Sequence, residues 1–206
     1  MAPIEAAFAD AWPGAALQHL LDDALPGDLE RAGRVDEAIT QRFVRLALYA
    51  AEAGADAVLF TCSAFGSAID AARAALSLPV MKPNEAMLDE ALRIGGDVVL
   101  LATYAPTLAS MVPEFEAAAA ASGRQVRVRP VFVPDALGAL SSGAAEAHDT
   151  LIAAAAAQHA GGSGVVALAQ FSMARAAPLV RGRVDAPVLT TPASAVAGLR
   201  RRLERA

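Results

Sequence analysis

The chain's only cysteine, Cys62, stands where an apolar run gives way to small polar residues. The run occupies residues 57–60, Thr61 and Ser63 flank the cysteine, and residues 68–73 have the pattern of a helix. Open α/β sheets place their chemistry where a buried parallel strand ends and a helix begins, so this position suits a functional thiol. Backbone N–H groups at such a helix start can hold a carboxylate, and their partial positive charge favours a thiolate.

The elements that must position this thiol alternate along the chain. Short apolar runs bounded by Gly, Pro or small polar residues predict strands, and segments with apolar residues at helical spacing predict helices between them. Asp36, for example, is placed to cap a long helix that ends before Gly54. This alternation indicates a parallel α/β fold. The predicted strands lie at residues 15–20, 57–62, 79–81, 97–103, 126–133, 165–169 and 187–189.

An internal repeat gives the thiol a counterpart. Shifting the chain by 108 residues lays residues 58–62 on 166–170 and Arg73 on Arg181 without a gap. Two similar halves therefore each supply a strand–loop–helix corner, one ending in Cys62 and the other in Gln170. If the halves pack across a pseudo-twofold axis, these two residues approach one cleft from opposite sides. The alternative is a coincidental similarity between two Ala/Val-rich βαβ units, which share composition by necessity.

The repeat also indicates a missing strand. The counterpart of residues 97–103 in the first half would lie before residue 1. The first strand of a doubly wound sheet lies in the middle, where its absence leaves its neighbours unpaired. We therefore expect the natural chain to start upstream of Met1, the alternative being that another segment fills this position.

Composition excludes several classes of function. The chain has 206 residues, of which 55% are hydrophobic and 19% charged, and its net charge of −5 argues against nucleic acid as a partner. No apolar run approaches the ~20 residues of a membrane span, and the N-terminal residues lack the pattern of a secretory signal. A single cysteine fits a reducing cytoplasm, and no His/Cys/Asp spacing suits a metal. A cytoplasmic protein without a metal site is the expectation.

Four segments together resemble the aspartate/glutamate/hydantoin racemase superfamily. They are FTCSAFG at 60–66, KPNEAM at 82–87, LATYAPT at 101–107 and LAQFSM at 168–173. The resemblance covers essentially the whole chain apart from the missing first strand. It implies two pseudo-symmetric, flavodoxin-like lobes with parallel sheets and the active site in the cleft between them. The lobes would be residues 1–83 plus 187–206, lacking the first strand, and residues 84–186.

The resemblance also implies an activity. Typical members need no metal, pyridoxal phosphate or other cofactor, and carry a cysteine at each corner as opposed acid and base on the carbon next to a carboxylate. Here Gln170 replaces the second cysteine, and glutamine cannot ionise, so two-base racemisation is not expected. Cys62 could instead protonate an enediolate after decarboxylation, or attack a carbon covalently as in relatives similar to maleate isomerase. A relative that binds a small carboxylate without catalysis is the rival interpretation.

Carried over residue by residue, the resemblance implies Cys62 as the catalytic residue and a set of substrate-binding residues around the two corners. The ligand would be a small carboxylate, and a homodimer is compatible with the family. The substrate-binding set is Thr61, Ser63, Thr103, Tyr104, Thr107, Gln170 and Ser172.

Three other polar residues could contribute. Lys82, the only lysine, follows a predicted strand and faces either the cleft or solvent. Asn84 is expected to cap a helix rather than bind a ligand. His148 beside Asp149 could act as a base, but a surface position is the preferred interpretation.

Overall fold

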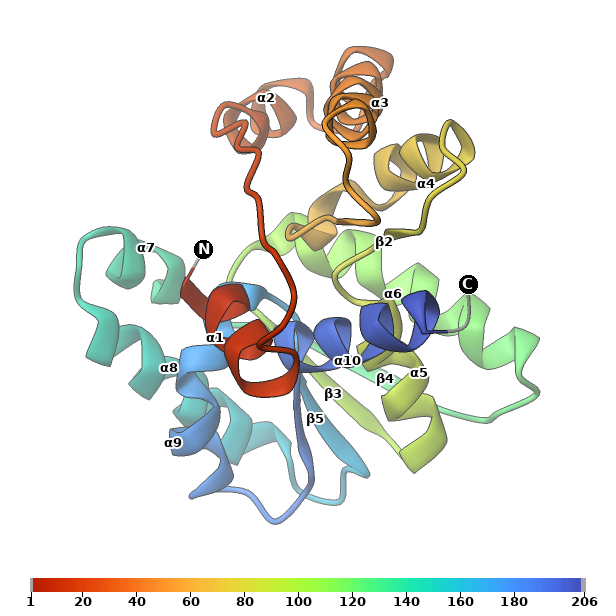
Figure 1. The fold of residues 1–206 in the computed structure, drawn as a ribbon. Coiled ribbons are helices and arrows are strands. Elements are labelled where there is room, and N and C mark those ends of the chain that lie inside the picture. The colour runs from red at the N-terminus through yellow and green to blue at the C-terminus, as the bar shows by residue number, and fades with distance from the viewer. Residues whose placement is uncertain (1, 205–206) are drawn as a thin grey trace.

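A computed structural model describes residues 2–204, and its largest unit is a four-stranded parallel sheet with the order β4-β3-β5-β6 (Figure 1). The strands are β3 (Val98–Ala102), β4 (Val128–Phe132), β5 (Val165–Leu168) and β6 (Val188–Thr190). The central strands β3 and β5 are completely buried, as their uninterrupted Val/Leu/Ala runs predict for strands covered on both faces. The α/β fold with parallel strands is confirmed.

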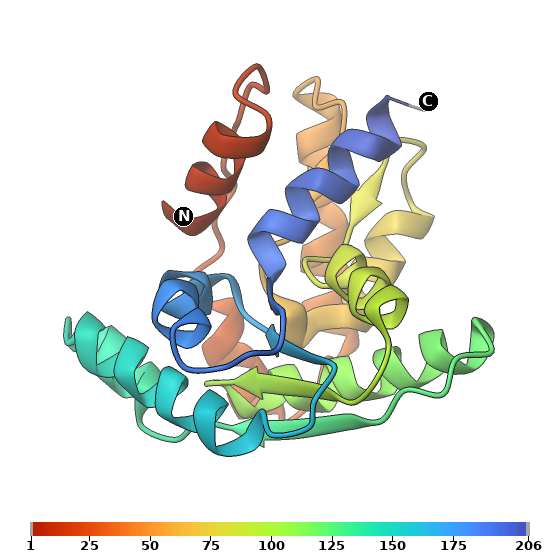
Figure 2. The same ribbon diagram turned by 90° about the horizontal axis from the view of Figure 1, so that it is seen from below.

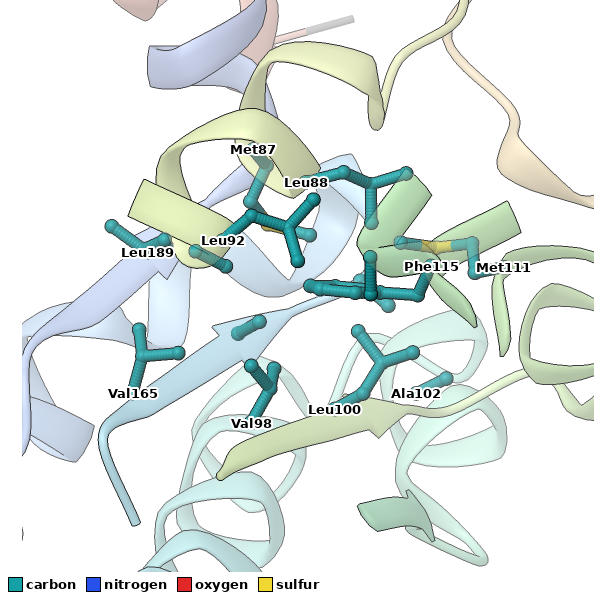
Figure 3. Packing of buried hydrophobic residues seen from close by; sticks show 14 residues of the cluster. Met87, Leu88, Leu92, Val98, Leu100, Ala102, Met111, Phe115, Val165 and Leu189 are labelled. Carbon is teal, nitrogen blue, oxygen red and sulfur yellow. The ribbon is translucent and has the colours of Figure 1, made fainter. Parts of the chain in front are cut away.

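Helices cover both faces of this sheet. On one face lie α5 (Glu85–Ile94) and α6 (Ala105–Ala121), which bury Met87, Leu92 and Phe115 against β3 and β5 (Figure 3). The other face is covered by α8 (Ala145–His159) and α9 (Ala177–Arg181). The short helix α7 (Ala136–Ser141) comes before α8, the 3-10 turn η2 (Phe171–Ala176) comes before α9, and both contribute buried residues to this face. Because both faces are packed, the free carboxyl ends of the strands are where polar groups can gather.

The first half forms a smaller unit around two parallel strands, β1 (Val58–Leu59) and β2 (Val80–Met81). Its helices are α1 (Ala2–Ala11), α2 (Leu25–Ala32), α3 (Glu37–Glu52) and α4 (Gly66–Ala74), with the 3-10 turn η1 (Ser63–Phe65) before α4. Phe43 of α3 packs on Phe60 and Phe65, with ring centroids 5.0 and 4.9 Å apart. As predicted, Asp36 caps α3 by accepting a hydrogen bond from the Ile39 N–H.

The order of elements repeats at the shift of 108 residues. The strands β1 and β2 correspond to β5 and β6, and the helices α1 and α3 correspond to α6 and α8. In the same way, α5 corresponds to α10 (Thr191–Leu203). The last helix, α10, packs against α1 and α5 and can be followed between them in Figure 2. The two-lobed arrangement is thus consistent with the repeat that the sequence predicts.

The lobe boundaries at residues 83/84 and 186/187 stay a prediction. One observation agrees with them and one does not. The helix α10 packs with Ile4, Phe8 and Met81 of the first half, as the boundary at 187 requires. The strand β6, however, pairs with β5 in the larger sheet.

The smaller sheet contains no counterpart of β3 within residues 2–204. The strand β1 pairs only with β2 and is half-buried, whereas its counterpart β5 is fully buried between two strands. The predicted strand at residues 15–20 is wrong, because this segment forms no strand and leaves Leu17 and Leu20 exposed. A strand needs a partner for its N–H and C=O groups, and this segment pairs with none of the described strands.

Candidate active site

The two corners predicted to face each other are in contact. Ser63, which follows Cys62 and opens η1, is buried, and its hydroxyl donates a hydrogen bond of 3.3 Å to the carbonyl oxygen of Ala169. Ala169 immediately precedes Gln170 at the end of β5. A side chain of the first half therefore binds the backbone of the second half next to the residue that replaces the second cysteine.

Gln170 itself binds the start of α6. Its Oε1 accepts hydrogen bonds from the N–H groups of Thr103 and Tyr104, at 2.6 and 3.2 Å, and from the Thr103 hydroxyl at 3.1 Å. The first N–H groups of a helix have no partner within the helix and attract oxygen atoms with negative charge. The amide oxygen of Gln170 thus occupies the donors that the sequence assigns to a substrate carboxylate.

The thiol of Cys62 lies in a partly buried, apolar environment. It packs in the same cluster as Phe65 and Tyr104, and it is partly exposed. Burial raises the pKa of the Cys62 thiol above its ordinary value, and a hydrogen bond from the Ala64 backbone lowers it by a smaller amount. The expectation that helix-start N–H groups favour a thiolate is therefore wrong for this structure, because desolvation outweighs them. At neutral pH the thiol is protonated.

Tyr104 connects the thiol to α6. Burial raises the pKa of the Tyr104 phenol, with smaller contributions from the negative charge of Glu30 and from the ionised form of Cys62 at high pH. Its hydroxyl oxygen is buried and has no hydrogen-bond partner among the described residues. A polar atom of this kind beside a thiol can donate a hydrogen bond to an oxygen of a ligand.

The other three predicted binding residues are less tightly connected. Thr107 is buried in the first turn of α6, Ser172 is half-buried in η2, and Thr61 is exposed. Within residues 2–204 their side chains make no hydrogen bond to protein atoms. Hydrogen bonds therefore connect Ser63 to the Gln170 corner and Gln170 to Thr103 and Tyr104, and Tyr104 packs in the same cluster as Cys62. Thr61, Thr107 and Ser172 are neighbours of these corners in sequence only.

Two of the remaining polar residues lie in a charged cluster with Asp70 and Glu114. Lys82 is only 8% exposed and lies between Asp70 of the first half and Glu114 of the second half, so the solvent alternative is wrong. Asn84 precedes α5, but its side chain donates to Glu114 Oε2 at 2.6 Å and does not cap the helix. Glu114 was not identified from the sequence. The one available signal is that a lone lysine, once buried, requires a carboxylate partner.

The preferred surface position of His148 is also wrong. The side chain is completely buried, with Nδ1 2.8 Å from Asp149 Oδ1, because the first turn of α8 packs on η2. Asp149 also accepts a hydrogen bond from Arg175 of η2. No described contact connects His148 to Cys62, so a role as base has no support in the geometry.

The surface cavities lie away from the two corners. Two surface cavities of about 160 and 410 Å³ lie between α5 and α10, and no predicted site residue lines either one. In the described part of the chain, no three His, Cys, Asp or Glu side chains come together as metal ligands. None of the helices in residues 2–204 is both long and apolar enough to cross a membrane. The candidate site is therefore defined by the hydrogen bonds that join the corners.

A family model described as Asp/Glu/Hydantoin racemase matches residues 4–199, which is nearly the whole chain. The chain belongs to the Asp/Glu/Hydantoin racemase family. The resemblance inferred from the four segments is confirmed, and with it the assignment to a family of racemase-type enzymes. A comparison with curated protein sequences gave no match.

Solved structures share the fold of this racemase-family protein at low sequence identity. A glutamate racemase isoform from Bacillus anthracis is 14% identical with a TM-score of 0.76, the match covering 99% of this chain and 77% of that one. A glutamate racemase from Francisella tularensis in complex with D-glutamate is 14% identical with a TM-score of 0.70, covering 98% and 76%. An arylmalonate decarboxylase is 18% identical with a TM-score of 0.57, covering 81% and 77%.

Proposed function

We propose that this racemase-family protein is a one-thiol enzyme that acts at the carbon next to the carboxylate of a small organic or amino acid. Cys62 is its acid/base group, and no cofactor takes part. The observation that carries the proposal is the contact between the corners. Ser63, next to the partly buried Cys62, binds the backbone beside Gln170, and the N–H groups of Thr103 and Tyr104 hold the Gln170 oxygen. A carboxylate or enediolate oxygen can take the place of Gln170 Oε1 on these donors.

The protonation state of the thiol favours an acid over a nucleophile. Because burial raises the pKa of Cys62, the thiol carries its proton at neutral pH and can give it to a carbanion or enediolate. A covalent attack on carbon needs the thiolate, which the same burial disfavours. Gln170 carries no ionisable proton, so it orients the substrate while a single face of the carbon receives a proton.

Decarboxylation followed by protonation is the second candidate, and the pairing of a protonated thiol with a neutral glutamine favours it. As CO2 leaves a malonate-type substrate, the electron pair of the broken C–C bond delocalises into the remaining carboxylate as an enediolate. The Cys62 S–H proton then forms the new C–H bond, and the thiolate regains a proton from water. No base is needed on the opposite face, and the fold shared with arylmalonate decarboxylase is compatible with this route.

The other binding assignments belong to the same proposal. Ser63, Thr103 and Tyr104 would contact the carboxylate or enediolate, and Thr61, Thr107 and Ser172 would contact the rest of the substrate. A cytoplasmic location, a homodimer and the absence of a nucleic-acid partner remain predictions from composition and family.

Deuterium incorporation tests the proposal. The protein is incubated in D2O with phenylmalonate, with methylphenylmalonate, or with D- or L-glutamate or -aspartate, and products are followed by NMR and chiral chromatography. We expect deuterium at the carbon next to the carboxylate, and a loss of about 10²–10⁴-fold in rate for Cys62→Ser. Deuterium incorporation that survives Cys62→Ser would overturn the role of the thiol. Protection of Cys62 from iodoacetamide by these acids without any turnover would instead identify a carboxylate-binding protein.

A further inference from the structure

Lys82 and Glu114 join the two halves of the molecule beneath the thiol corner. The Lys82 ammonium at the end of β2 donates to Asp70 Oδ2 at 2.7 Å and to Glu114 Oε1 at 2.9 Å. Burial lowers the pKa of Lys82, the two carboxylates raise it by more, and the net shift is upward, so the ammonium stays charged. A buried cation of this kind fixes the position of the carboxylates around it.

Both oxygens of Glu114 are bound by the loop between β2 and α5. Oε1 accepts from Lys82, and Oε2 accepts from the side chain of Asn84 at 2.6 Å, with Asn84 only 1% exposed. Glu114 belongs to α6, the helix directly preceded by Thr103 and Tyr104, whose N–H groups hold the Gln170 oxygen. It lies ten residues after Tyr104, or about 15 Å along the helix axis. The single helix α6 therefore connects the Gln170 corner to this loop.

The same carboxylate touches the backbone that follows Cys62. A β-carbon placed on Gly66 would lie 2.2 Å from Glu114 Oε1 and 2.9 Å from the Ser110 hydroxyl, so a larger residue here would force the Glu114 carboxylate to move. Gly66 begins α4 directly after η1, and η1 packs on α6. Ala64 of η1 supplies the backbone hydrogen bond to the Cys62 thiol. A continuous path leads from Glu114 through Gly66 and Ala64 to the sulfur.

We infer that Glu114 is a positioning residue for Cys62, which it holds against α6 through its ion pair with Lys82, its bond to Asn84 and its contact with Gly66. The thiol and the Gln170 corner keep a fixed separation because both are anchored on α6. Glu114 does not touch the reacting atoms. For turnover this inference rests on the proposed function, whereas for the reactivity of the thiol it stands alone.

The test is the rate of Cys62 alkylation by iodoacetamide in Glu114→Gln, measured from pH 6 to 10 under native conditions. Losing the ion pair lets η1 move away from α6, which exposes the thiol. We therefore expect alkylation at least about threefold faster than wild type and a pH midpoint closer to that of an ordinary thiol. Where wild type turns over a substrate, kcat falls at the same time, since a displaced thiol delivers its proton less well.

Two further variants keep the inference testable if Glu114→Gln folds poorly. Asn84→Ala removes a single bond to Glu114 and should give a smaller increase in the same direction. Asp97→Asn is the matched control, because it removes a carboxylate that pairs with Arg127 at the opposite end of β3. If Glu114 had a purely structural role, Glu114→Gln and Asn84→Ala would lower the Tm and leave the alkylation rate of native Cys62 unchanged.

Alkylation within twofold of wild type, or slower, in both Glu114→Gln and Asn84→Ala overturns the inference. An equal increase in Asp97→Asn overturns it as well, because the effect would then be general loosening. Faster alkylation in a protein whose wild type turns over none of the acids tested supports the positioning role and refutes the proposed function alone.

Discussion

Replacing Gln170 by alanine removes the oxygen that holds the start of α6, and the structure predicts both a loss of stability and its chemical rescue. Gln170 Oε1 accepts three hydrogen bonds, from the Thr103 N–H, the Thr103 hydroxyl and the Tyr104 N–H. A net contribution of about 0.5–1.5 kcal/mol for each gives an upper bound of about 4.5 kcal/mol. Because Gln170 is half-buried, water can replace some of these hydrogen bonds in Gln170→Ala. We therefore expect the free energy of unfolding to fall by about 2 kcal/mol.

The rescue follows from the chemistry of the donors that alanine leaves free. Acetate offers a carboxylate oxygen to the same N–H groups, so it should bind Gln170→Ala and stabilise it. At ten times its dissociation constant a ligand adds about 1.4 kcal/mol to the free energy of unfolding. In wild type the amide oxygen competes for these donors, and the gain is smaller.

Urea unfolding of wild type and Gln170→Ala, with sodium acetate or with sodium chloride at equal ionic strength, measures both effects. Gln158→Ala is the control, since it truncates an exposed glutamine of α8. Equal stabilisation of all three proteins by acetate would refute the idea that Gln170 occupies a carboxylate site. A loss below about 0.5 kcal/mol in Gln170→Ala would refute the energetic contribution of the three hydrogen bonds.

Three further outcomes are expected. Gln170→Cys supplies a second ionisable group and should raise exchange of the α-proton of glutamate or aspartate in D2O by about 10²-fold; a folded variant that binds the acid without exchange would contradict the pairing of the two corners. Because burial raises the pKa of Cys62, its alkylation midpoint should lie above that of an ordinary thiol. The unfolded thiol ionises first as pH rises, so the free energy of unfolding should decline above about pH 8.5, and Cys62→Ser should lack that decline in urea titrations. Asp36→Ala removes the cap on the Ile39 N–H and should lower the free energy of unfolding by about 1 kcal/mol, seen as a lower urea midpoint with an unchanged slope.

Most of the fold could be predicted because its signals are local. The strands β3 and β5 are continuous apolar runs, and the helix α3 has its cap residue Asp36 immediately before it. The repeat of 108 residues also placed Cys62 and Gln170 at equivalent corners. The predicted strand at residues 15–20 failed because a strand depends on a neighbouring edge, which no local pattern reveals.

The chemistry of the candidate site was only partly predictable. The sequence identified Cys62 as the residue of interest and Gln170 as the departure from a pair of cysteines. The expectation of a thiolate failed, since the pKa depends on how much apolar surface surrounds the sulfur in the folded chain. That desolvation outweighs the helix-start N–H groups became evident only from packing.

By itself, then, the sequence determined the parallel α/β class, the two-fold repeat, the family and the positions of the two corners. Only the tertiary structure decided which atoms meet there: the Gln170 oxygen on the N–H groups before α6, and Lys82 on a glutamate 32 residues away. The physical reason is that propensities, caps and apolar periods act over a few residues. The partners of a buried polar group, in contrast, are set by how distant elements pack against one another.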